Sequence, residues 1–175
     1  MNNIKCPVIG FVAYSGTGKT SLLKKIIQHF KKNTAFKIGV IKHAHHDFDI
    51  DTPGKDSYEL RHAGATQMLV ASKNRWALVT ETPTTDPEPN LNYLLSQLNH
   101  SELDLILVEG FKHEIFDKIE LHRPSLGKAV LFPHDENIIA IATDNPKKIE
   151  TSLPILDINN VKSIIHFLTE KYNLS

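Results

Sequence analysis

The chain is poor in the features that mark secreted, membrane-spanning or nucleic-acid-binding proteins. Its 175 residues include one cysteine, Cys6, which excludes an internal disulfide framework and favours a reducing cytoplasm. No apolar run approaches the ~20 residues of a membrane span, and we expect no signal peptide before the first strand-like run. The 20 basic and 20 acidic residues balance to zero net charge, which argues against a dedicated binder of nucleic acid or membrane surfaces. We therefore expect one cytoplasmic domain over residues 1–175.

The most specific motif is a glycine-rich turn, Ala13-Tyr14-Ser15-Gly16-Thr17-Gly18-Lys19-Thr20. It matches G-x-x-x-x-G-K-[ST], with Ala13 in place of the first glycine. A β-branched-rich apolar run at residues 8–12 precedes it, and apolar residues at helical spacing follow over residues 19–32. Strand, turn and helix in this order direct backbone N–H groups at an anion. The motif predicts a nucleoside triphosphate site, in which Lys19 reaches the β- and γ-phosphates and the Thr20 hydroxyl binds Mg²⁺.

The remaining sequence alternates strand-like and helix-like runs, which is typical of an α/β domain with a largely parallel sheet. We expect strands at residues 8–12, 37–42, 103–108, 118–121, 138–142 and 154–156, and helices at residues 19–32, 56–62, 91–98 and 161–172. Together with the turn motif, this order predicts a P-loop NTPase fold with a mostly parallel central sheet flanked by helices.

Two strand-like runs, residues 66–72 and 75–81, depart from this alternation and are expected to form an antiparallel hairpin. Apolar residues occupy both of its faces: Leu69, Ala71, Trp76 and Leu78 on one, and Met68, Val70, Ala77 and Val79 on the other. A hairpin with one solvated face would alternate more cleanly. Either the hairpin is a central strand pair covered on both sides, or it is an extension that packs on a second subunit of a homodimer.

A carboxylate at the end of a buried strand is the second feature expected of a P-loop protein, because it holds Mg²⁺. The run Leu105-Ile106-Leu107-Val108-Glu109 places Glu109 in that position. An ionised side chain at the tip of an apolar strand is costly without a cation or donor nearby. Glu109 is therefore predicted to act on Mg²⁺, directly or through water, and a structural salt bridge is the alternative.

Residues 43–51, His43-Ala44-His45-His46-Asp47-Phe48-Asp49-Ile50-Asp51, are dense in potential ligands. They follow the second strand, where switch loops of P-loop proteins approach the γ-phosphate and the metal. Asp47 is a candidate metal ligand and Asp49 a candidate catalytic residue that orients water. A transition-metal site and an ordinary solvated loop are the alternatives, and the H-x-H-H-D spacing is no recognised zinc pattern.

A nucleobase contact is predicted at Asp144, which follows the late strand-like run of residues 139–143. A carboxylate there could accept hydrogen bonds from N1–H and the 2-amino group of guanine. The familiar N-K-x-D run is absent, and Asp144-Asn145-Pro146 is equally suited to a turn or a helix start.

Residues 15–20, 42–51 and 108–112, together with Pro53-Gly54-Lys55-Asp56-Ser57-Tyr58 and Arg75-Trp76-Ala77-Leu78, carry a specific resemblance. Over nearly its whole length the chain resembles the molybdopterin-guanine dinucleotide biosynthesis protein B family. The resemblance implies a dimeric GTP-binding P-loop protein with at most weak GTPase activity. It implies an adapter role beside the partner enzyme that joins GMP to molybdopterin, with molybdopterin itself as a further candidate ligand.

Carried over by position, the resemblance implies nucleotide binding at Ser15, Gly16, Thr17, Gly18, Lys19, Thr20 and Ser21. It also implies Mg²⁺ linked to Thr20 and Glu109, and a functional role for residues 43–51. Lys19 and Asp49 are the residues expected to support any slow GTP hydrolysis.

Two other functions share these motifs. A small-molecule kinase would use the same P-loop, but such kinases bring several arginines to the transferred phosphoryl group, and this chain has only Arg61, Arg75 and Arg123. A metal-delivery GTPase is expected to carry a Cys-rich or long His-rich tract, which this sequence lacks. We therefore expect an adapter.

Overall fold

The computed structural model describes residues 6–44, 48–82 and 88–174. The chain divides into two compact units, one formed by residues 1–43 and 90–175 and the other by residues 44–89. We call the first the main unit and the second the hairpin unit. The prediction of a single domain stays a prediction, because it concerns whether the two units fold together.

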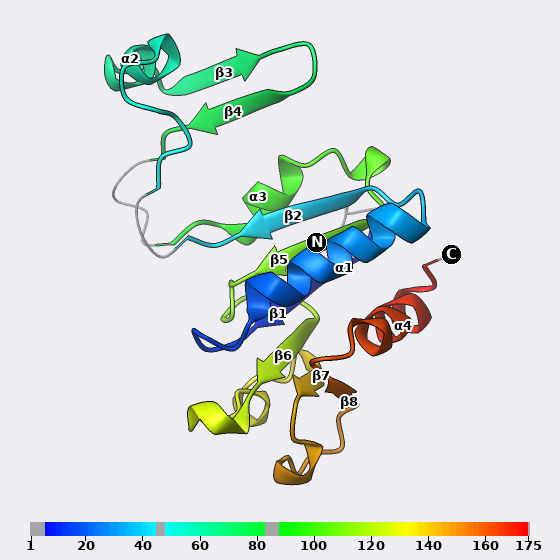
Figure 1. Cartoon of the computed structure of the whole chain (residues 1–175). Coiled ribbons are helices and arrows are strands. Elements are labelled where there is room, and N and C mark those ends of the chain that lie inside the picture. Colours follow the sequence, from blue (N-terminus) through cyan, green and yellow to red (C-terminus); the bar gives the residue numbers. More distant parts are fainter. Residues whose placement is uncertain (1–5, 45–47, 83–87, 175) are drawn as a thin grey trace. The chain divides into compact units, whose positions relative to one another are not determined.

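The main unit contains a six-stranded sheet in the order β2-β5-β1-β6-β7-β8 (Figure 1). The strands are β1 (Val8–Val12), β2 (Ile38–Lys42), β5 (Leu105–Glu109), β6 (Lys118–His122), β7 (Ile138–Thr143) and β8 (Ile155–Asp157). Every neighbouring pair is parallel. Parallel strands that are covered on both faces are apolar along their whole length, as Leu105–Val108 of β5 show with no exposed surface. The expected α/β architecture is confirmed.

Two hydrophobic cores lie on opposite faces of this sheet, because alternate residues of β1 and β5 enter different cores. On one face, α1 (Lys19–Asn33) and α4 (Val161–Tyr172) pack against each other and bury Ile26 and Leu168 completely. On the other face, α3 (Leu91–Ser96) buries Leu95. Short 3₁₀ turns complete the main unit at His100–Glu102, Pro124–Leu126, Phe132–His134 and Pro146–Lys148. No helix among the described residues is long and apolar enough to cross a membrane.

The glycine-rich turn follows β1, the strand from which successive connections lead to opposite sides of the sheet. From β1 the chain crosses through α1 to β2, on the side of β5, whereas β6, β7 and β8 extend the sheet on the other side of β1. In open parallel sheets, ligands bind at the carboxyl ends of the strands at such a point. The ends of β1, β5 and β6 therefore define the region of interest.

The hairpin unit contains α2 (Asp56–His62) and a separate two-stranded antiparallel sheet, β3 (Gln67–Ala71) and β4 (Trp76–Thr80). The hairpin is therefore no central strand pair of the main sheet, so the first of the two interpretations of its apolar faces is wrong. Leu69 and Leu78 pair directly across the strands and are 57% and 42% exposed, and Trp76 on the same face is 68% exposed. Within this chain, one apolar face of the hairpin lies largely open to solvent.

Candidate nucleotide-binding site

The P-loop joins β1 to α1 through two glycines in the left-handed region, Gly16 with φ +83° and Gly18 with φ +97°. A Cβ atom at either position would meet nothing within 4 Å, so the backbone conformation and not the available space requires glycine. Gly18 is the N-cap of α1 and provides no side-chain cap, and the first turn carries no acidic residue. The free N–H groups of this turn and the positive end of the helix dipole form an anion site.

The side chains of the P-loop divide into those that shape the turn and those that face outward. Thr17 is only 2% exposed, and its hydroxyl donates to the carbonyl of Tyr14 at 2.7 Å, so this side chain closes the turn. The Thr17 N–H also donates to the Tyr14 carbonyl, at 3.4 Å, so a backbone contact from Thr17 to phosphate would replace this long hydrogen bond. Ser15 lies exposed in the loop, while Lys19, Thr20 and Ser21 form the first turn of α1, with Thr20 and Ser21 exposed and Lys19 half-buried.

Glu109 meets the P-loop at the end of β5, as the sequence predicted. The Thr20 hydroxyl donates to its Oε1 at 3.4 Å, and Lys42 Nζ, at the end of β2, lies 3.8 Å from its Oε2. Partial burial lowers the pKa of Lys19. The Glu109 carboxylate opposes this change, while the positive charges of Lys42 and Lys112 add to it. A bound polyphosphate would supply the negative charge that this group of lysines lacks.

The hydroxyl and carboxylate oxygens of Thr20 and Glu109 suit Mg²⁺, which prefers oxygen ligands and retains waters and substrate phosphates in its coordination shell. In the described part of the chain, no three His, Cys, Asp or Glu side chains come together as a metal site. The two oxygens fit a metal that needs few protein ligands, as Mg²⁺ does in P-loop proteins, where a Ser or Thr hydroxyl and a strand-end carboxylate hold it.

The backbone after Glu109 is tightly packed on the end of β2. Gly110 has φ +94°, and a Cβ there would lie 2.7 Å from the Cβ of His43, so glycine is required for both conformation and space. The N–H of His43 donates to the carbonyl of Glu109 at 2.8 Å, and its ring stacks on Phe111 with centroids 4.8 Å apart. These contacts fix the direction in which Glu109 leaves its strand.

The two predicted aspartates of residues 43–51 are not part of the main unit that the structure describes around the P-loop. Asp47, like His45 and His46, lies outside the described residues. Asp49 belongs to the hairpin unit, where Arg61 donates to it at 2.5 Å and also to Glu81 at 2.8 Å. The hydrogen bond from Arg61 lowers the pKa of Asp49. The roles of Asp47 in metal binding and of Asp49 in catalysis, and the transition-metal and solvated-loop alternatives, stay untested.

Asp144 directly follows β7, as expected of a residue near the base, and it is engaged by Arg123. The guanidinium nitrogen Nη1 donates to Asp144 Oδ2 at 2.5 Å, Nη2 donates to Asn159 Oδ1 at 3.1 Å, and Nε donates to the carbonyl of Thr17 at 3.1 Å. The turn alternative is also realised, because Asn145 precedes the 3₁₀ turn at Pro146–Lys148. Sequence reasoning missed Arg123 and Asn159, although their place after β6 and β8 at the ligand-binding edge was a usable signal.

A cavity of about 690 Å³ lies beside the end of β1, lined in part by Val12, Lys112, His113 and His134. Buried charges on β6 hold its walls. Lys118 Nζ donates to the carbonyls of Lys112 and Glu114 at 3.0 and 2.8 Å and pairs with Asp135 at 2.6 Å. Glu120 accepts from the N–H groups of Leu131 and Phe132 at 2.8 and 2.9 Å, and burial raises its pKa. Lys112, which lines the cavity, follows Glu109 by three residues.

Comparison with known proteins identifies this combination of fold and motifs. The family described as molybdopterin guanine dinucleotide synthesis protein B matches residues 8–144. The molybdopterin-guanine dinucleotide biosynthesis adapter protein of Escherichia coli is 50% identical over 94% of this chain and 92% of its own length. The protein of the same description from Haemophilus influenzae is 42% identical over 96% of this chain and 90% of its own length.

A solved structure agrees with the fold. The crystal structure of a MobB protein homolog from Bacillus stearothermophilus superposes with a TM-score of 0.69, covering 96% of this chain and 99% of the other at 23% identity. The glycine-rich turn, the strand-end carboxylate and the sheet order thus occur in a chain whose relatives share one description. The chain belongs to the molybdopterin guanine dinucleotide synthesis protein B (MobB) family.

Proposed function

We propose that this protein is a cytoplasmic GTP-binding adapter of molybdopterin guanine dinucleotide biosynthesis. The main support for a nucleotide site is the position of the P-loop, which follows β1, beside Glu109 at the end of β5, where the Thr20 hydroxyl donates to the Glu109 carboxylate. The adapter role rests on the E. coli and H. influenzae relatives, both described as adapter proteins of this pathway. The partner is the enzyme that joins GMP to molybdopterin.

In this proposal, the main unit binds the triphosphate and neutralises its charge. The N–H groups of the P-loop and of the first turn of α1 surround the phosphates, Lys19 contacts the β- and γ-phosphates, and Thr20 and Glu109 hold Mg²⁺. Ser15 and Ser21 flank this turn. Hydrolysis is at most slow, with Lys19 stabilising charge and Asp49 orienting water, and the protein's main task is to present a bound nucleotide or a molybdopterin ligand to its partner.

Homodimerisation through the hairpin is part of the same proposal. One face of β3 and β4 presents Leu69, Trp76 and Leu78, which are 57%, 68% and 42% exposed. A contiguous apolar face of this kind is unusual on a monomer, and burying it against a second copy would remove it from water. The family resemblance favours the second copy as the occupant.

The arginine contacts favour an adapter over a small-molecule kinase. Arg61 is bonded to Asp49 and Glu81, and Arg123 to Thr17, Asp144 and Asn159. Arg75 lies exposed at the tip of the hairpin. Two of the three arginines are therefore held by protein acceptors rather than free to contact a transferred phosphoryl group, and the charged side chains nearest Glu109 and Lys19 include Lys42 and Lys112.

The test is a calorimetric titration with GTP and ATP, each with Mg²⁺ and with EDTA, followed by an acceptor-phosphorylation screen. The proposal expects Mg²⁺-dependent binding that prefers GTP, no phosphorylated acceptor, and increased product formation when the protein is added to its partner enzyme. Binding of ATP alone together with acceptor phosphorylation would establish the kinase instead. A stoichiometric transition metal in the purified protein would favour metal delivery.

A further inference from the structure

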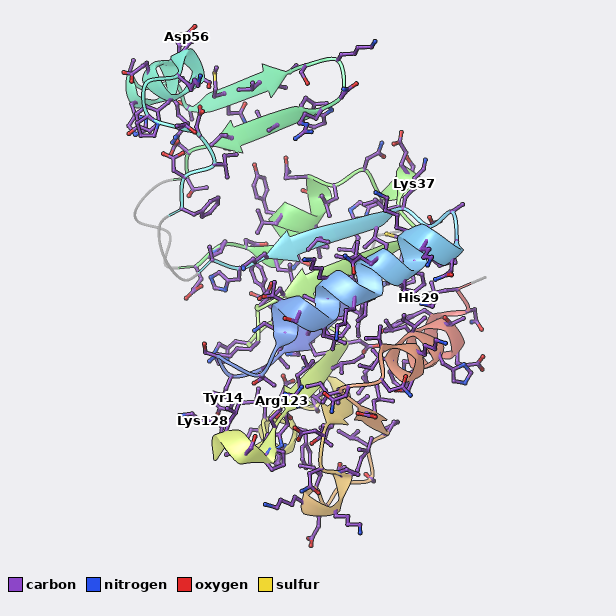
Figure 2. The ribbon with its side chains drawn as sticks, viewed as in Figure 1. Tyr14, His29, Lys37, Asp56, Arg123 and Lys128 are labelled. Atoms are coloured by element: carbon purple, nitrogen blue, oxygen red, sulfur yellow. The ribbon has the colours of Figure 1, made fainter. Side chains whose placement is uncertain are left out.

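Arg123 connects three loops that are distant in the sequence and adjacent at one edge of the main sheet. It directly follows β6, and its three donor nitrogens reach Thr17 in the P-loop, Asp144 after β7 and Asn159 after β8, at 3.1, 2.5 and 3.1 Å. Figure 2 shows Arg123 at the same end of the main unit as Tyr14 of the P-loop. One guanidinium therefore fixes the phosphate loop relative to the loops that follow the last two strands.

The bonds from Arg123 determine which atoms of its partners remain available. Guanidinium donates only, so Asn159 must accept through Oδ1, and its Nδ2 donor group points to the other side of the amide. Asp144 accepts through Oδ2, and within the described part of the chain its Oδ1 has no further hydrogen-bond partner. Asn159 is exposed, and the Asp144 side chain is 28% exposed. Arg123 thus leaves one acceptor and one donor group accessible, held close together.

This pair of free groups matches the edge of a guanine base. Guanine presents donors at N1 and the 2-amino group and an acceptor at O6, whereas adenine presents a donor at its 6-amino group. The Asp144 carboxylate can accept from the guanine donors, and the Asn159 amide can donate to O6. Adenine would place its 6-amino donor against the donor of Asn159. Polar groups that are left unmatched in this way discriminate against the wrong base.

We propose that Asn159 reads the O6 atom of guanine beside Asp144, and that Arg123 is the positioning residue that orients both side chains and sets their distance from the P-loop. This inference rests on the proposed function, because it assumes that the P-loop binds GTP. Arg123 contacts no part of the nucleotide in this arrangement. Its effect is exerted through the two side chains and through the carbonyl of Thr17.

Binding measurements with four nucleotides separate these roles. GTP, ITP, XTP and ATP differ only in the base, and tripolyphosphate lacks the base altogether. Asn159→Asp replaces the donor by an acceptor facing O6, and should weaken GTP about 10- to 100-fold with tripolyphosphate unchanged. Asn99→Asp is the matched control, since Asn99 is exposed and lies before β5, at the opposite edge of the sheet from the P-loop.

Asp144 and Arg123 have their own diagnostic changes. Asp144→Asn should exchange the preference for GTP for a preference for XTP, because xanthine carries a carbonyl acceptor at position 2 and the new amide can donate to it. Arg123→Lys keeps the charge but cannot bridge three acceptors. It should reduce the GTP-to-ITP and GTP-to-ATP affinity ratios at least about fivefold, whereas a merely structural role would weaken all nucleotides equally.

The outcomes distinguish this inference from the proposed function. Wild-type protein that fails to bind GTP would refute the function itself. If wild-type protein binds GTP and Asn159→Asp keeps the same GTP affinity and base selectivity, only the proposed contact between Asn159 and O6 is overturned. Equal weakening of GTP, ITP and ATP in Arg123→Lys would overturn the positioning role. If Arg123→Lys does not fold, as judged by circular dichroism, Asn159→Asp and Asp144→Asn still decide the base contacts.

Discussion

Glu109→Gln should change GTP affinity in opposite directions with and without Mg²⁺. In the metal-free site, the carboxylate lies 3.4 Å from the Thr20 hydroxyl at the start of α1, where a triphosphate must bind. A negative charge in this position repels the phosphates until a cation comes between them. The amide keeps the shape of the side chain and removes the repulsion, so GTP should bind more tightly to the variant in EDTA.

The magnitude follows from Coulomb's law. Two unit charges about 6 Å apart interact with about 3 kcal/mol at an effective dielectric constant of about 20. Lys42, 3.8 Å from the carboxylate, offsets part of this repulsion, and salt screening reduces it to about 1 kcal/mol. The variant should therefore bind GTP about fivefold more tightly in EDTA. In Mg²⁺ it loses a charged metal partner and should bind about tenfold more weakly.

Calorimetric titration of GTP in EDTA and in Mg²⁺ measures both effects. Glu102→Gln is the matched control, because this exposed residue lies before β5 and the substitution changes net charge equally. Thr20→Ala should lose only Mg²⁺-dependent affinity. Lys19→Ala should weaken binding in both conditions by about 1.5–3 kcal/mol, or roughly 10- to 150-fold. Glu109→Gln that weakens GTP equally in both conditions would refute the metal role, and unchanged binding by Lys19→Ala would refute the P-loop assignment.

Three further predictions concern stability, assembly and loop ordering. Asp135→Asn leaves buried Lys118 without a counter-ion and should cost about 2–3 kcal/mol, lowering Tm by about 4–12 °C. Burial raises the pKa of Asp135, but the hydrogen bond from Lys118 outweighs it and holds this pKa below its ordinary value of 3.8. The difference in stability between wild type and variant should therefore persist at neutral pH and vanish only as the pH falls through that lower pKa. Equal Tm values at pH 7 would contradict this prediction. Leu69→Lys combined with Leu78→Glu keeps an attractive cross-strand pair but places charges on the apolar face. Sedimentation should then show a monomer, and circular dichroism should show that the variant is folded. A wild-type protein that is monomeric at micromolar concentration would contradict the dimer. Hydrogen exchange over residues 43–51 should slow more with a GTP analogue and Mg²⁺ than with GDP, and equal protection by both would argue for a solvated loop.

The P-loop and its carboxylate were predictable because their signals are local. The backbone conformations at Gly16 and Gly18 can be adopted freely only by glycine, and the apolar run before Glu109 identifies a buried strand. Parallel strands place their carboxyl ends at one edge, so the meeting of Thr20 with Glu109 followed from strand assignment. The helices at residues 56–62 and 161–172 also agree with the structure, because periodicity and terminal residues define them.

The Arg123 contacts could not be predicted in the same way. Arg123 binds Thr17, Asp144 and Asn159, which are 106, 21 and 36 residues away in the sequence. Its place after a strand puts Arg123 at the ligand-binding edge, but only the order of the strands brings these three loops to one side chain. Asn159 lies between β8 and α4, and its contact with Arg123 likewise depends on the strand order.

Sequence alone determined that this chain has an α/β P-loop fold, and it predicted that Lys19, Thr20 and Glu109 form the proposed nucleotide site. Residue type at fixed spacing encodes backbone conformation and periodic burial, and both are local properties. The tertiary structure decided that the hairpin stands outside the main sheet, since its two apolar faces were compatible with either place. It also decided that Arg123 joins the phosphate loop to Asp144 and Asn159, because a side chain's partners across a sheet depend on strand order and register, which no single segment specifies.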